Sequence, residues 1–357
     1  MTVEPTPPPD LSSPFAALLR HIAPEEIPTS EDLLSADQLR ALLESERPYD
    51  LLFLGDVMLG EKLARRIDGA GIDYPFAGIL PLLRKSVLVV ANLEAPFATA
   101  PREPTERFSY RVPPGLVNVL TRAGVSAVNL ATNHLLDCGR DGVIQTLDTL
   151  AEAGIGAFGA GRDEAQARMP LVLRAGPRRV GMLGWYWHSR CGAAGTLPGC
   201  ALSDPALVQA AIQELRPRVD YLVASFHWGE TYVRQPSAEA RMKARLAIDA
   251  GADLVIGHHP HVLQPMEIHR GRPIFYSLGN GLMGSGNSRA EGLAVAVRCA
   301  QQKAEIHLYP LYVKNRDPRI DYQTKVLAGA GAARLLGNLQ SNALIRTTQR
   351  AGAGITL

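Results

Sequence analysis

The sequence predicts an α/β fold whose parallel strands end in polar side chains. Short runs of apolar, often β-branched residues alternate with stretches of helical periodicity, which is typical of parallel sheets covered by helices on both faces. Most of these runs are followed directly by an acidic residue, an asparagine or a histidine. Because open α/β sheets bind ligands at the carboxyl ends of their strands, the pattern predicts a functional site along one sheet edge.

The composition is that of an ordinary globular protein. Of 357 residues, 46% are hydrophobic and 20% are charged, and the formal net charge of +2 predicts neither a nucleic-acid nor a membrane partner. Residues 1–10 lack the basic and apolar regions of a signal peptide, and no apolar run is long enough to span a membrane. We therefore expect a cytoplasmic protein in which the 4 cysteines, none in a CxxC pair, are free thiols.

The amino-terminal leader, residues 1–48, carries no chemical motif. Residues 1–13 are rich in proline and are expected to be extended or disordered. Residues 15–22 and 30–46 have helical patterns, and Ser30 is the expected N-cap of the second helix because two acids follow it in the first turn. We expect this leader to pack on the main body or to cover its rim.

The main body begins with an apolar run and continues through strands separated by helices and loops. Strands are expected where such runs are bounded by glycine, proline or asparagine, and helices where apolar residues recur with helical spacing. Residues 99–114 lack this periodicity and form a long loop of the kind that often covers a site. The expected strands are 49–54, 86–90, 126–130, 155–158, 171–174, 180–185, 221–226, 254–257, 273–277 and an antiparallel pair, 293–297 with 304–313; the expected helices are 61–67, 141–153, 205–215, 238–249 and a tail, 324–344, followed by a frayed end.

The most informative stretch is residues 254–262, where three histidines follow an apolar strand. The chain has only 9 histidines, and His258, His259 and His261 lie within four positions. Neutral imidazole is the commonest metal ligand of proteins, and two such groups close together suit Zn, Mn, Fe or Co. Pro260 stiffens the backbone between the last two histidines, which we take as ligands. We take His258 as a structural residue or as one that supports the ligands without binding the ion itself. The alternative is a surface loop whose histidines share no function.

Further candidate ligands follow other apolar runs of the chain. If these runs are parallel strands of one region, their polar side chains meet at one rim and form a mixed oxygen and nitrogen ligand set, which Mg and Ca do not prefer. The set is large enough for two cations bridged by a carboxylate, an arrangement that generates hydroxide near neutral pH and clamps an in-line displacement at phosphorus. These residues are Asp56, Glu94, Asn133 with His134, His227 and Asn280.

Each of these residues also has a purely structural interpretation. Asp56 would then cap the following helix, and Glu94 would pair with Arg111 at the rim. Asn133 would stabilise a turn, His134 would be a hydrogen-bonded structural residue, and His227 would pack beside Trp228.

The order of the motifs resembles the capsule-synthesis CapA family, also known as the poly-γ-glutamate biosynthesis type, which is similar to the calcineurin-like metallophosphoesterases. The resemblance covers about residues 50–285 and rests on six motifs in order. They are Gly55-Asp56-Val-Met-Leu-Gly60, Asn92-Leu-Glu94, Ala131-Thr-Asn-His134 with Asp137 and Gly139, His227-Trp-Gly229, Gly251-Ala-Asp-Leu-Val-Ile-Gly-His-His-Pro-His261 and Tyr276-Ser-Leu-Gly-Asn280.

The resemblance implies a four-layer α/β/β/α sandwich of metallophosphoesterase type, with a site that holds one or two divalent ions (Mn, Fe, Zn or Co). Residues 49–315 would form this domain, between the helical leader, residues 1–48, and a helical tail, residues 316–357. Asp56 would bind the first ion and Glu94 would bridge, because it takes the place that wider phosphoesterases give to aspartate. Asn133 and His227 would bind the second ion, with His259 and His261 divided between the two.

The resemblance also implies roles in catalysis and substrate binding. His134 matches the histidine that protonates the leaving group or steadies the transition state. Asp137 is the acid expected to orient it, with Asp141 as the alternative. Met58 stands where wider phosphoesterases have a further histidine. A small anionic substrate is expected to contact Arg107, Arg111, Trp228, Glu230 and Asn280.

Three functional hypotheses follow from the sequence. The first is a metal-dependent hydrolase, for which manganese is one candidate ion, that cleaves a phosphoester with a metal-bound hydroxide. The second is an enzyme on the same scaffold that acts on an amide, γ-glutamyl or peptide-like substrate in polymer or natural-product biosynthesis, which Met58 favours. The third is a non-enzymatic accessory protein of polymer synthesis or export.

Overall fold

The strand β1 (Tyr49–Met58) divides its side chains between two hydrophobic cores. Leu51 and Phe53 belong to one core, and Leu52 and Leu54 belong to the other. Because successive side chains of a strand point to opposite faces, a strand that is apolar throughout must be covered on both sides. This strand therefore lies at the centre of a layered molecule.

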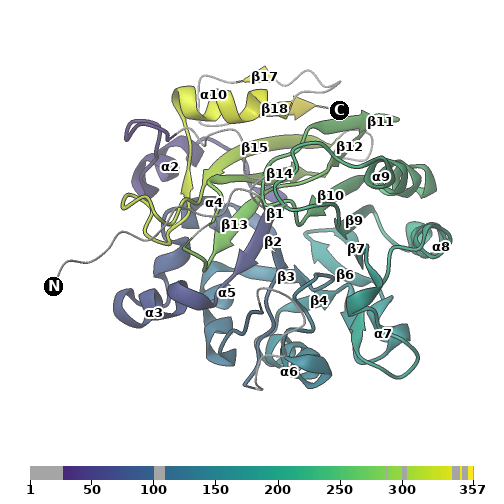
Figure 1. Cartoon of the computed structure of the whole chain (residues 1–357). Helices are drawn as coiled ribbons and strands as arrows, with labels where there is room; N and C mark the ends of the chain where they lie inside the picture. Colours follow the sequence, from purple (N-terminus) through teal and green to yellow (C-terminus); the bar gives the residue numbers. More distant parts are fainter. Residues whose placement is uncertain are drawn as a thin grey trace, which may run out of the picture.

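The strand β9 (Tyr221–His227) shows the same division in a second sheet. Its Val223 shares the core of Phe53, whereas Leu222 joins a third core under other helices. The computed structural model thus has two sheets packed face to face, with helices on both outer faces, which confirms the predicted α/β/β/α sandwich (Figure 1). It describes residues 27–99, 109–286, 288–299, 304–339, 346–347 and 353–356.

Parallel strands form one half of the first sheet and the centre of the second. The first sheet has the order β17-β18-β15-β14-β1-β2-β3-β4, with β13 also on β1 and β16 on β15, and the second has the order β11-β12-β10-β9-β7-β6. The strands β1 to β4 are mutually parallel, as are β7, β9, β10 and β12. Their bounds are β2 Ser86–Leu93, β3 Val125–Asn129, β4 Gly156–Phe158, β6 Leu171–Ala175, β7 Arg178–Tyr186, β10 Leu254–His258, β11 Met266–His269, β12 Arg272–Phe275, β13 Asn280–Met283, β14 Glu291–Arg298, β15 Glu305–Tyr312, β16 Lys325–Val326, β17 Arg346–Thr347 and β18 Ala353–Thr356, with β5 Ala160–Gly161 and β8 Gly199–Cys200 as a separate pair.

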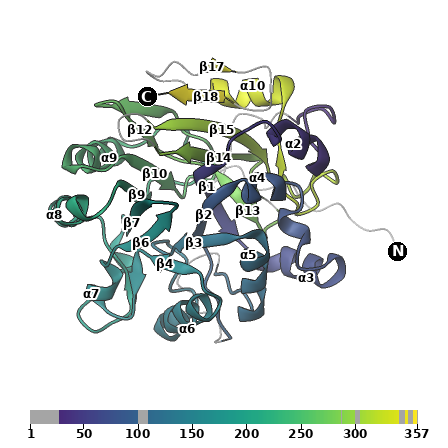
Figure 2. The ribbon, with the colours of Figure 1, turned by 180° about the vertical axis from the view of Figure 1, so that it is seen from behind.

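Two groups of helices cover the outer faces of the sheets. The helices α2 to α6 pack on the first sheet, and α8 and α9 pack on the second. In both views the two groups of helices lie on opposite sides of the pair of sheets (Figures 1 and 2). A further helix, α10, contributes side chains to the core between the sheets. The helices are α2 Ala36–Leu43, α3 Glu61–Ala70, α4 Leu80–Arg84, α5 Val117–Ala123, α6 Gly139–Glu152, α7 Glu164–Ala167, α8 Pro205–Leu215, α9 Ala238–Ala250 and α10 Gly329–Gly337.

The first strand is longer than the sequence predicts. We expected it to end at residue 54, but β1 continues to Met58 because β13 pairs with its second half, where Asp56 lies opposite Asn280. The short strand β13 was not predicted, since its four residues resemble a loop. Asp56 therefore lies within a strand and not after one.

The predicted helices at both ends of the chain are shorter than expected. The second leader helix begins after Ser35, which forms a capping box with Gln38, because residues 29–34 make contacts with the carboxyl-terminal part instead. The predicted tail helix is interrupted by β16 and reduced to α10. Residues 353–356 pair with β15 as β18 and are not frayed. The expectations for residues 1–22 lie outside the described residues.

Asp32 ties the leader to the amino terminus of α10. Its Oδ1 accepts a hydrogen bond from the backbone N–H of Gly331 at 3.0 Å, and its Oδ2 accepts one from the backbone N–H of Thr29 at 2.9 Å. The N-cap residue of α10, Ala328, offers no side-chain hydrogen bond of its own. Asp32, about three hundred positions earlier in the chain, therefore supplies a hydrogen-bond acceptor for a backbone N–H at the amino terminus of α10.

Replacing Asp32 with alanine is expected to lower the free energy of unfolding by about 1–2 kcal/mol, which is the usual cost of losing a helix cap. Urea denaturation of the two proteins measures the difference. Asp37→Ala is a suitable control, because the Asp37 side chain is 87% exposed and pairs with Arg40 at the surface. Equal stability of the Asp32 and Asp37 variants would contradict the assignment.

Among the residues that the structure describes, no helix combines the length and apolar character needed to cross a membrane.

Candidate metal centre

Four polar residues lie in register across four adjacent strands of the first sheet. They are Asn280 of β13, Asp56 of β1, Asn92 of β2 and Asn129 of β3. Asn129 Nδ2 donates to Asn92 Oδ1 at 2.7 Å, and Asn92 Nδ2 donates to Asp56 Oδ1 at 2.8 Å. All four are at most 1% exposed, so buried hydrogen bonds fix the orientation of the Asp56 carboxylate.

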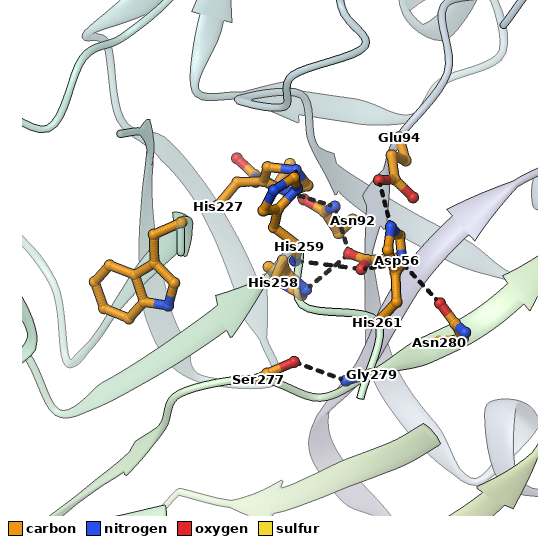
Figure 3. A network of polar contacts seen from close by, with 12 residues as sticks. Asp56, Asn92, Glu94, His227, His258, His259, His261, Ser277, Gly279 and Asn280 are labelled. Atoms are coloured by element: carbon orange, nitrogen blue, oxygen red, sulfur yellow. Dashed lines mark hydrogen bonds and ion pairs between the residues drawn. The ribbon is translucent and has the colours of Figure 1, made fainter. Parts of the chain in front are cut away.

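The second sheet brings histidines to the same place. His227 ends β9 and lies opposite His258, which ends β10. His258 Nδ1 is 3.5 Å from Asp56 Oδ1, and Asn92 Nδ2 is 3.3 Å from His227 Nδ1 (Figure 3). The carboxyl ends of strands from both sheets therefore meet around Asp56.

The turn after β10 directs two further histidines toward the same carboxylate. His259 and His261 have left-handed backbones, with φ values of 96° and 55°, on either side of Pro260. The His259 N–H donates to Asp56 Oδ2 at 3.3 Å, and His261 Nδ1 lies 3.2 Å from the same oxygen. Non-glycine residues in this conformation are costly and concentrate at functional sites.

Glu94 belongs to two groups of candidate metal ligands. Asp56, Glu94 and His261 form one group, and Glu94, His227 and His259 form the other; within each group the ligand atoms lie within 4.8 Å of one another. His261 Nε2 is 3.2 Å from Glu94 Oε1, and Figure 3 shows Glu94 above His261. The structure thus brings together the carboxylates and imidazoles that the sequence singled out.

Asn133 adds an amide oxygen to the second group. Its Oδ1 lies 2.8 Å from His227 Nε2, which is also 3.0 Å from His259 Nδ1. Both contacts converge on the imidazole of His227, which is fully buried. A cation in this group would therefore find oxygen and nitrogen donors already assembled.

The chemistry of the donors fits divalent cations. Within the described part of the chain, both carboxylate oxygens of Glu94 are buried without a hydrogen-bond partner, although a buried carboxylate normally requires one. Burial and neighbouring His259 hold the pKa of His227 well below its usual range, and burial together with His261 lowers the pKa of His259 to about 3. Both imidazoles are consequently neutral near pH 7 and offer a lone pair to a metal ion.

Unlike the pKa values of His227 and His259, the pKa of His261 is raised, because two carboxylates lie beside it. Burial alone would lower its pKa, but Glu94 and Asp56 raise it well above the usual value. Burial likewise favours protonation of Asp56, yet its contacts with His258 and His261 hold the pKa of Asp56 well below the usual range. Without metal the first group is therefore a buried ion pair.

These shifts predict a stability maximum of the metal-free protein near pH 6.5. His227 and His259 have folded pKa values below the unfolded value of 6.5, so their contribution to stability is present above pH 6.5 and is lost as the pH falls. The pKa of His261 is raised, so its contribution is full below pH 6.5 and is lost as the pH rises.

The measurement is urea unfolding of the chelated protein as a function of pH. Below the maximum we expect the free energy of unfolding to fall by about 1.4 kcal/mol per pH unit for each extra proton bound by the unfolded chain. His259→Gln should make this acid limb shallower. A slope that does not change in the variant would be inconsistent with a neutral, buried His259.

His134 and Asp137 form a buried pair beside this centre. His134 Nδ1 lies 2.7 Å from Asp137 Oδ2, which also accepts a hydrogen bond from the Tyr110 N–H at 2.6 Å. The Tyr110 ring packs on His134, with 4.4 Å between centroids. Because a carboxylate only accepts, the His134 proton resides on Nδ1 and leaves Nε2 available for proton transfer.

The predicted substrate-binding residues do not gather in one place. The prediction that Trp228 binds the substrate is wrong. The Trp228 side chain is 2% exposed, stacks on Phe226 and donates its Nε1–H to the Tyr276 carbonyl in the outer core. Glu230 is exposed, and Arg111 is exposed with its guanidinium directed at the Thr99 carbonyl.

Two other predicted contacts have different outcomes. Asn280 Oδ1 lies 2.9 Å from His261 Nδ1, so it orients a candidate ligand. Arg107 lies outside the described residues.

Two further expectations concern sulfur-containing residues. Met58, which stands where wider phosphoesterases have a histidine, is buried, and its sulfur accepts a hydrogen bond from the Gly60 N–H. The four cysteines are free thiols, as expected.

Sequence reasoning missed Asn92 and Asn129 as parts of the centre. His258 was expected to be structural or to support the ligands, and it lies beside Asp56 and outside both groups of candidate ligands. Asn92 and Asn129 follow apolar residues in β2 and β3, as Asp56 does in β1, so their position at a strand end was the available signal. Their contact with Asp56 depends on strand register, which the sequence does not state.

Comparison with known proteins identifies one bacterial family and several of its relatives. The profile of the family described as "Bacterial capsule synthesis protein PGA_cap" matches residues 50–285. The chain is 32% identical over 248 residues to the PGA biosynthesis protein CapA of Bacillus subtilis (strain 168), covering 68% of this chain and 65% of that protein. It is 33% identical over 242 residues to a probable polyglutamine synthesis accessory protein of Mycobacterium tuberculosis (strain ATCC 25618 / H37Rv), covering 61% of this chain and 63% of that protein.

The matched region spans less than two thirds of the length of either relative. Among solved structures, the chain is similar to the TT1561 protein of Thermus thermophilus, with 11% identity and a TM-score of 0.40, over 68% of this chain and 93% of that chain. A TM-score this low provides no information about the site.

Proposed function

The chain belongs to the family of bacterial capsule synthesis proteins of the PGA_cap type, and on that premise we propose that it is a metal-dependent hydrolase that cleaves a phosphoester. The family agrees with the resemblance inferred from the six motifs. One observation supports this chemistry most directly. Glu94 is shared by two groups of candidate ligands, yet neither of its buried oxygens has a hydrogen-bond partner among the described residues. A carboxylate in that place suits a bridge between two cations.

Two divalent ions would be held by the two groups of ligands that share Glu94. When bound, such ions lower the pKa of water and neutralise charge on a phosphoryl group. The contribution of the chain is to hold its donors in fixed positions: Asn92 orients Asp56, and Asn280 orients His261. Because these contacts exist within the protein itself, little reorganisation accompanies catalysis.

His134 is proposed to give a proton to the leaving oxygen: the imidazolium form transfers its Nε2 proton and returns to the neutral form, which keeps the Nδ1–H. The Asp137 carboxylate accepts the Nδ1–H of His134 and so directs Nε2 away from itself. A histidine held in one tautomer by a carboxylate is a common arrangement for general acid catalysis. The substrate is proposed to be a small anion, in keeping with the neutral and cationic imidazoles that surround the site.

The test is the metal content and phosphatase activity of the purified protein. The chain would be stripped with a chelator, reloaded separately with Mn²⁺, Fe²⁺, Zn²⁺ or Co²⁺, and assayed for phosphate release from monoesters and diesters. Asp56→Asn and His261→Ala should lose bound metal and activity together. Wild-type levels of both in these variants would reject the proposal.

A second candidate function comes from the printed names of the relatives, which concern PGA biosynthesis and, in one case, an accessory role in polyglutamine synthesis. On that basis the same centre would act on an amide or γ-glutamyl bond, or the protein would assist a polymer synthase without catalysis. Cleavage of glutamyl peptides without phosphate release would favour the amide reaction. Metal binding without either reaction would favour the accessory role.

A further inference from the structure

Asn129 lies at the far end of the row of polar residues that leads to Asp56. It ends β3 and is 1% exposed. Its Oδ1 accepts a hydrogen bond from the backbone N–H of Ala131 at 3.3 Å, and its Nδ2 donates to Asn92 Oδ1 at 2.7 Å. Because a backbone N–H can only donate, the contact with Ala131 fixes which end of the Asn129 amide faces Asn92.

The direction of these hydrogen bonds continues to the carboxylate. Since Asn92 Oδ1 accepts from Asn129, Asn92 Nδ2 faces Asp56 and donates to its Oδ1 at 2.8 Å (Figure 3). A carboxylate only accepts, so the three bonds run in one direction, from the Ala131 backbone to Asp56. Each buried bond in such a series polarises the next one. Turning the Asn92 amide around would place two donors against each other at one end and two acceptors at the other.

Two glycines leave the space that the Asn129 carbonyl occupies. Gly184 belongs to β7 of the second sheet, and Gly159 directly follows β4 of the first. A Cβ at Gly159 would lie 2.6 Å from Asn129 Oδ1, and a Cβ at Gly184 would overlap with the same oxygen. The amide is therefore enclosed where the two sheets meet, and close packing holds it in place.

We infer that Asn129 is a positioning residue of the metal centre, which acts through Asn92 to hold Asp56 in the orientation that binds a cation. The inference rests on the metal site of the proposed function and adds to that site a residue that does not itself bind the ion. The contact with Ala131 alone does not explain an asparagine at this position, because it uses only the side-chain oxygen, and aspartate or serine would form the same turn. The amide nitrogen is what the contact with Asn92 requires.

The experiment measures Zn²⁺ binding by the chelator-stripped full chain, through competition with a chromophoric chelator. Asn129→Ser keeps a side-chain oxygen for the Ala131 N–H but removes the donor to Asn92. We expect it to weaken Zn²⁺ binding by about 10- to 100-fold, the range usual for the partners of metal ligands. In the Asn92→Ala background the same substitution should change the affinity by less than about 2-fold, because the connection to Asp56 is already broken.

Asn315→Ser is the matched control. Asn315 is also buried, and its Nδ2 donates to the carbonyls of Met283 and Ser285 at 2.6 and 2.7 Å. The same substitution thus removes comparable hydrogen bonds outside the row of polar residues, and it should leave the Zn²⁺ affinity within about 2-fold of the wild type. Urea unfolding of the stripped proteins shows that each variant compared is folded.

Gly184→Ala tests the same amide by a second route. The added methyl group would displace the Asn129 carbonyl, whereas every polar group of the row is kept. This variant should also weaken Zn²⁺ binding, and an unchanged affinity in a folded Gly184→Ala protein would contradict the inference even if Asn129→Ser does not fold.

A Zn²⁺ affinity of Asn129→Ser within about 2-fold of the wild type, or an equal loss in the wild-type and Asn92→Ala backgrounds, would overturn the inference. Phosphate release is measured separately. If the effect of Asn129 is found but no ester is cleaved, the proposed hydrolysis fails and the positioning role stands. If esters are cleaved in a metal-dependent reaction and Asn129→Ser keeps its affinity, the hydrolysis stands and the positioning role fails. A wild-type chain that binds no Zn²⁺ would also overturn the inference, whereas phosphate release with another ion would still support the hydrolysis.

Discussion

Replacing Glu94 with glutamine is expected to remove every bound metal ion and to lower phosphate release at least about 100-fold, since changes even in the outer partners of metal ligands cost 10- to 100-fold. The physical reason is that Glu94 is common to both groups of candidate ligands. His261 Nε2 lies 3.2 Å from Oε1, but neither oxygen of Glu94 accepts a hydrogen bond in the region that the structure describes, so a cation would complete the surroundings of this buried carboxylate. The amide of glutamine lacks the charge that a bridge between two cations requires.

Metal analysis of the purified variants provides the measurement, and thermal unfolding with and without added metal provides a second. Added metal should stabilise the wild type, because a ligand that binds only the folded state adds about 2.7 kcal/mol at a concentration of 100 Kd. The Glu94 variant should show no such gain. His259→Gln is the matched control, since it removes a ligand of one group and leaves Asp56, Glu94 and His261 in place. Equal metal loss in the two variants would argue against a shared carboxylate.

Replacing His134 with glutamine is expected to lower kcat by about 10²- to 10⁴-fold for phosphoesters with alkyl leaving groups, the range usual for general acid catalysis. An alkoxide needs a proton as it departs, whereas p-nitrophenolate leaves readily without one. Activity on p-nitrophenyl phosphate should therefore fall much less. The measurement is kcat for a series of esters that differ only in the pKa of the leaving group.

Asp137→Asn is the companion variant. It removes the carboxylate that accepts from His134 Nδ1 and from the Tyr110 N–H, so the imidazole loses its fixed tautomer while its chemistry is retained. The loss should show the same dependence on leaving group and should be accompanied by unchanged metal content. An equal loss for good and poor leaving groups would show that His134 is needed for folding or metal binding and not for proton transfer.

Much of the fold could be read from local patterns. The strand β1 is apolar throughout, and such a run requires cover on both faces, which leads directly to a layered α/β molecule. The helix α8 begins at Pro205 as expected, because proline suits the first turn, and the structure shows that the Asp204 side chain caps it. Strand ends were less certain: β1 was extended by pairing with β13, a segment too short to predict.

The sites of Asp32 and Trp228 show where local reasoning fails. Asp32 was expected in the first turn of a helix but caps a different helix, α10, from the other end of the chain. Trp228 follows His227 directly, yet the alternation of the strand turns its side chain into the outer core. In both cases the neighbour that decides the role is remote in sequence.

By itself the sequence determined the family, the layered fold and the chemical kinds of side chain that end the central strands, because these depend on local composition and on order along the chain. Only the tertiary structure decided that Glu94 is shared between two groups and that Asn92 lies between Asp56 and His227. The reason is that these distances are set by strand register and by the packing of one sheet on the other, neither of which is encoded in any single segment.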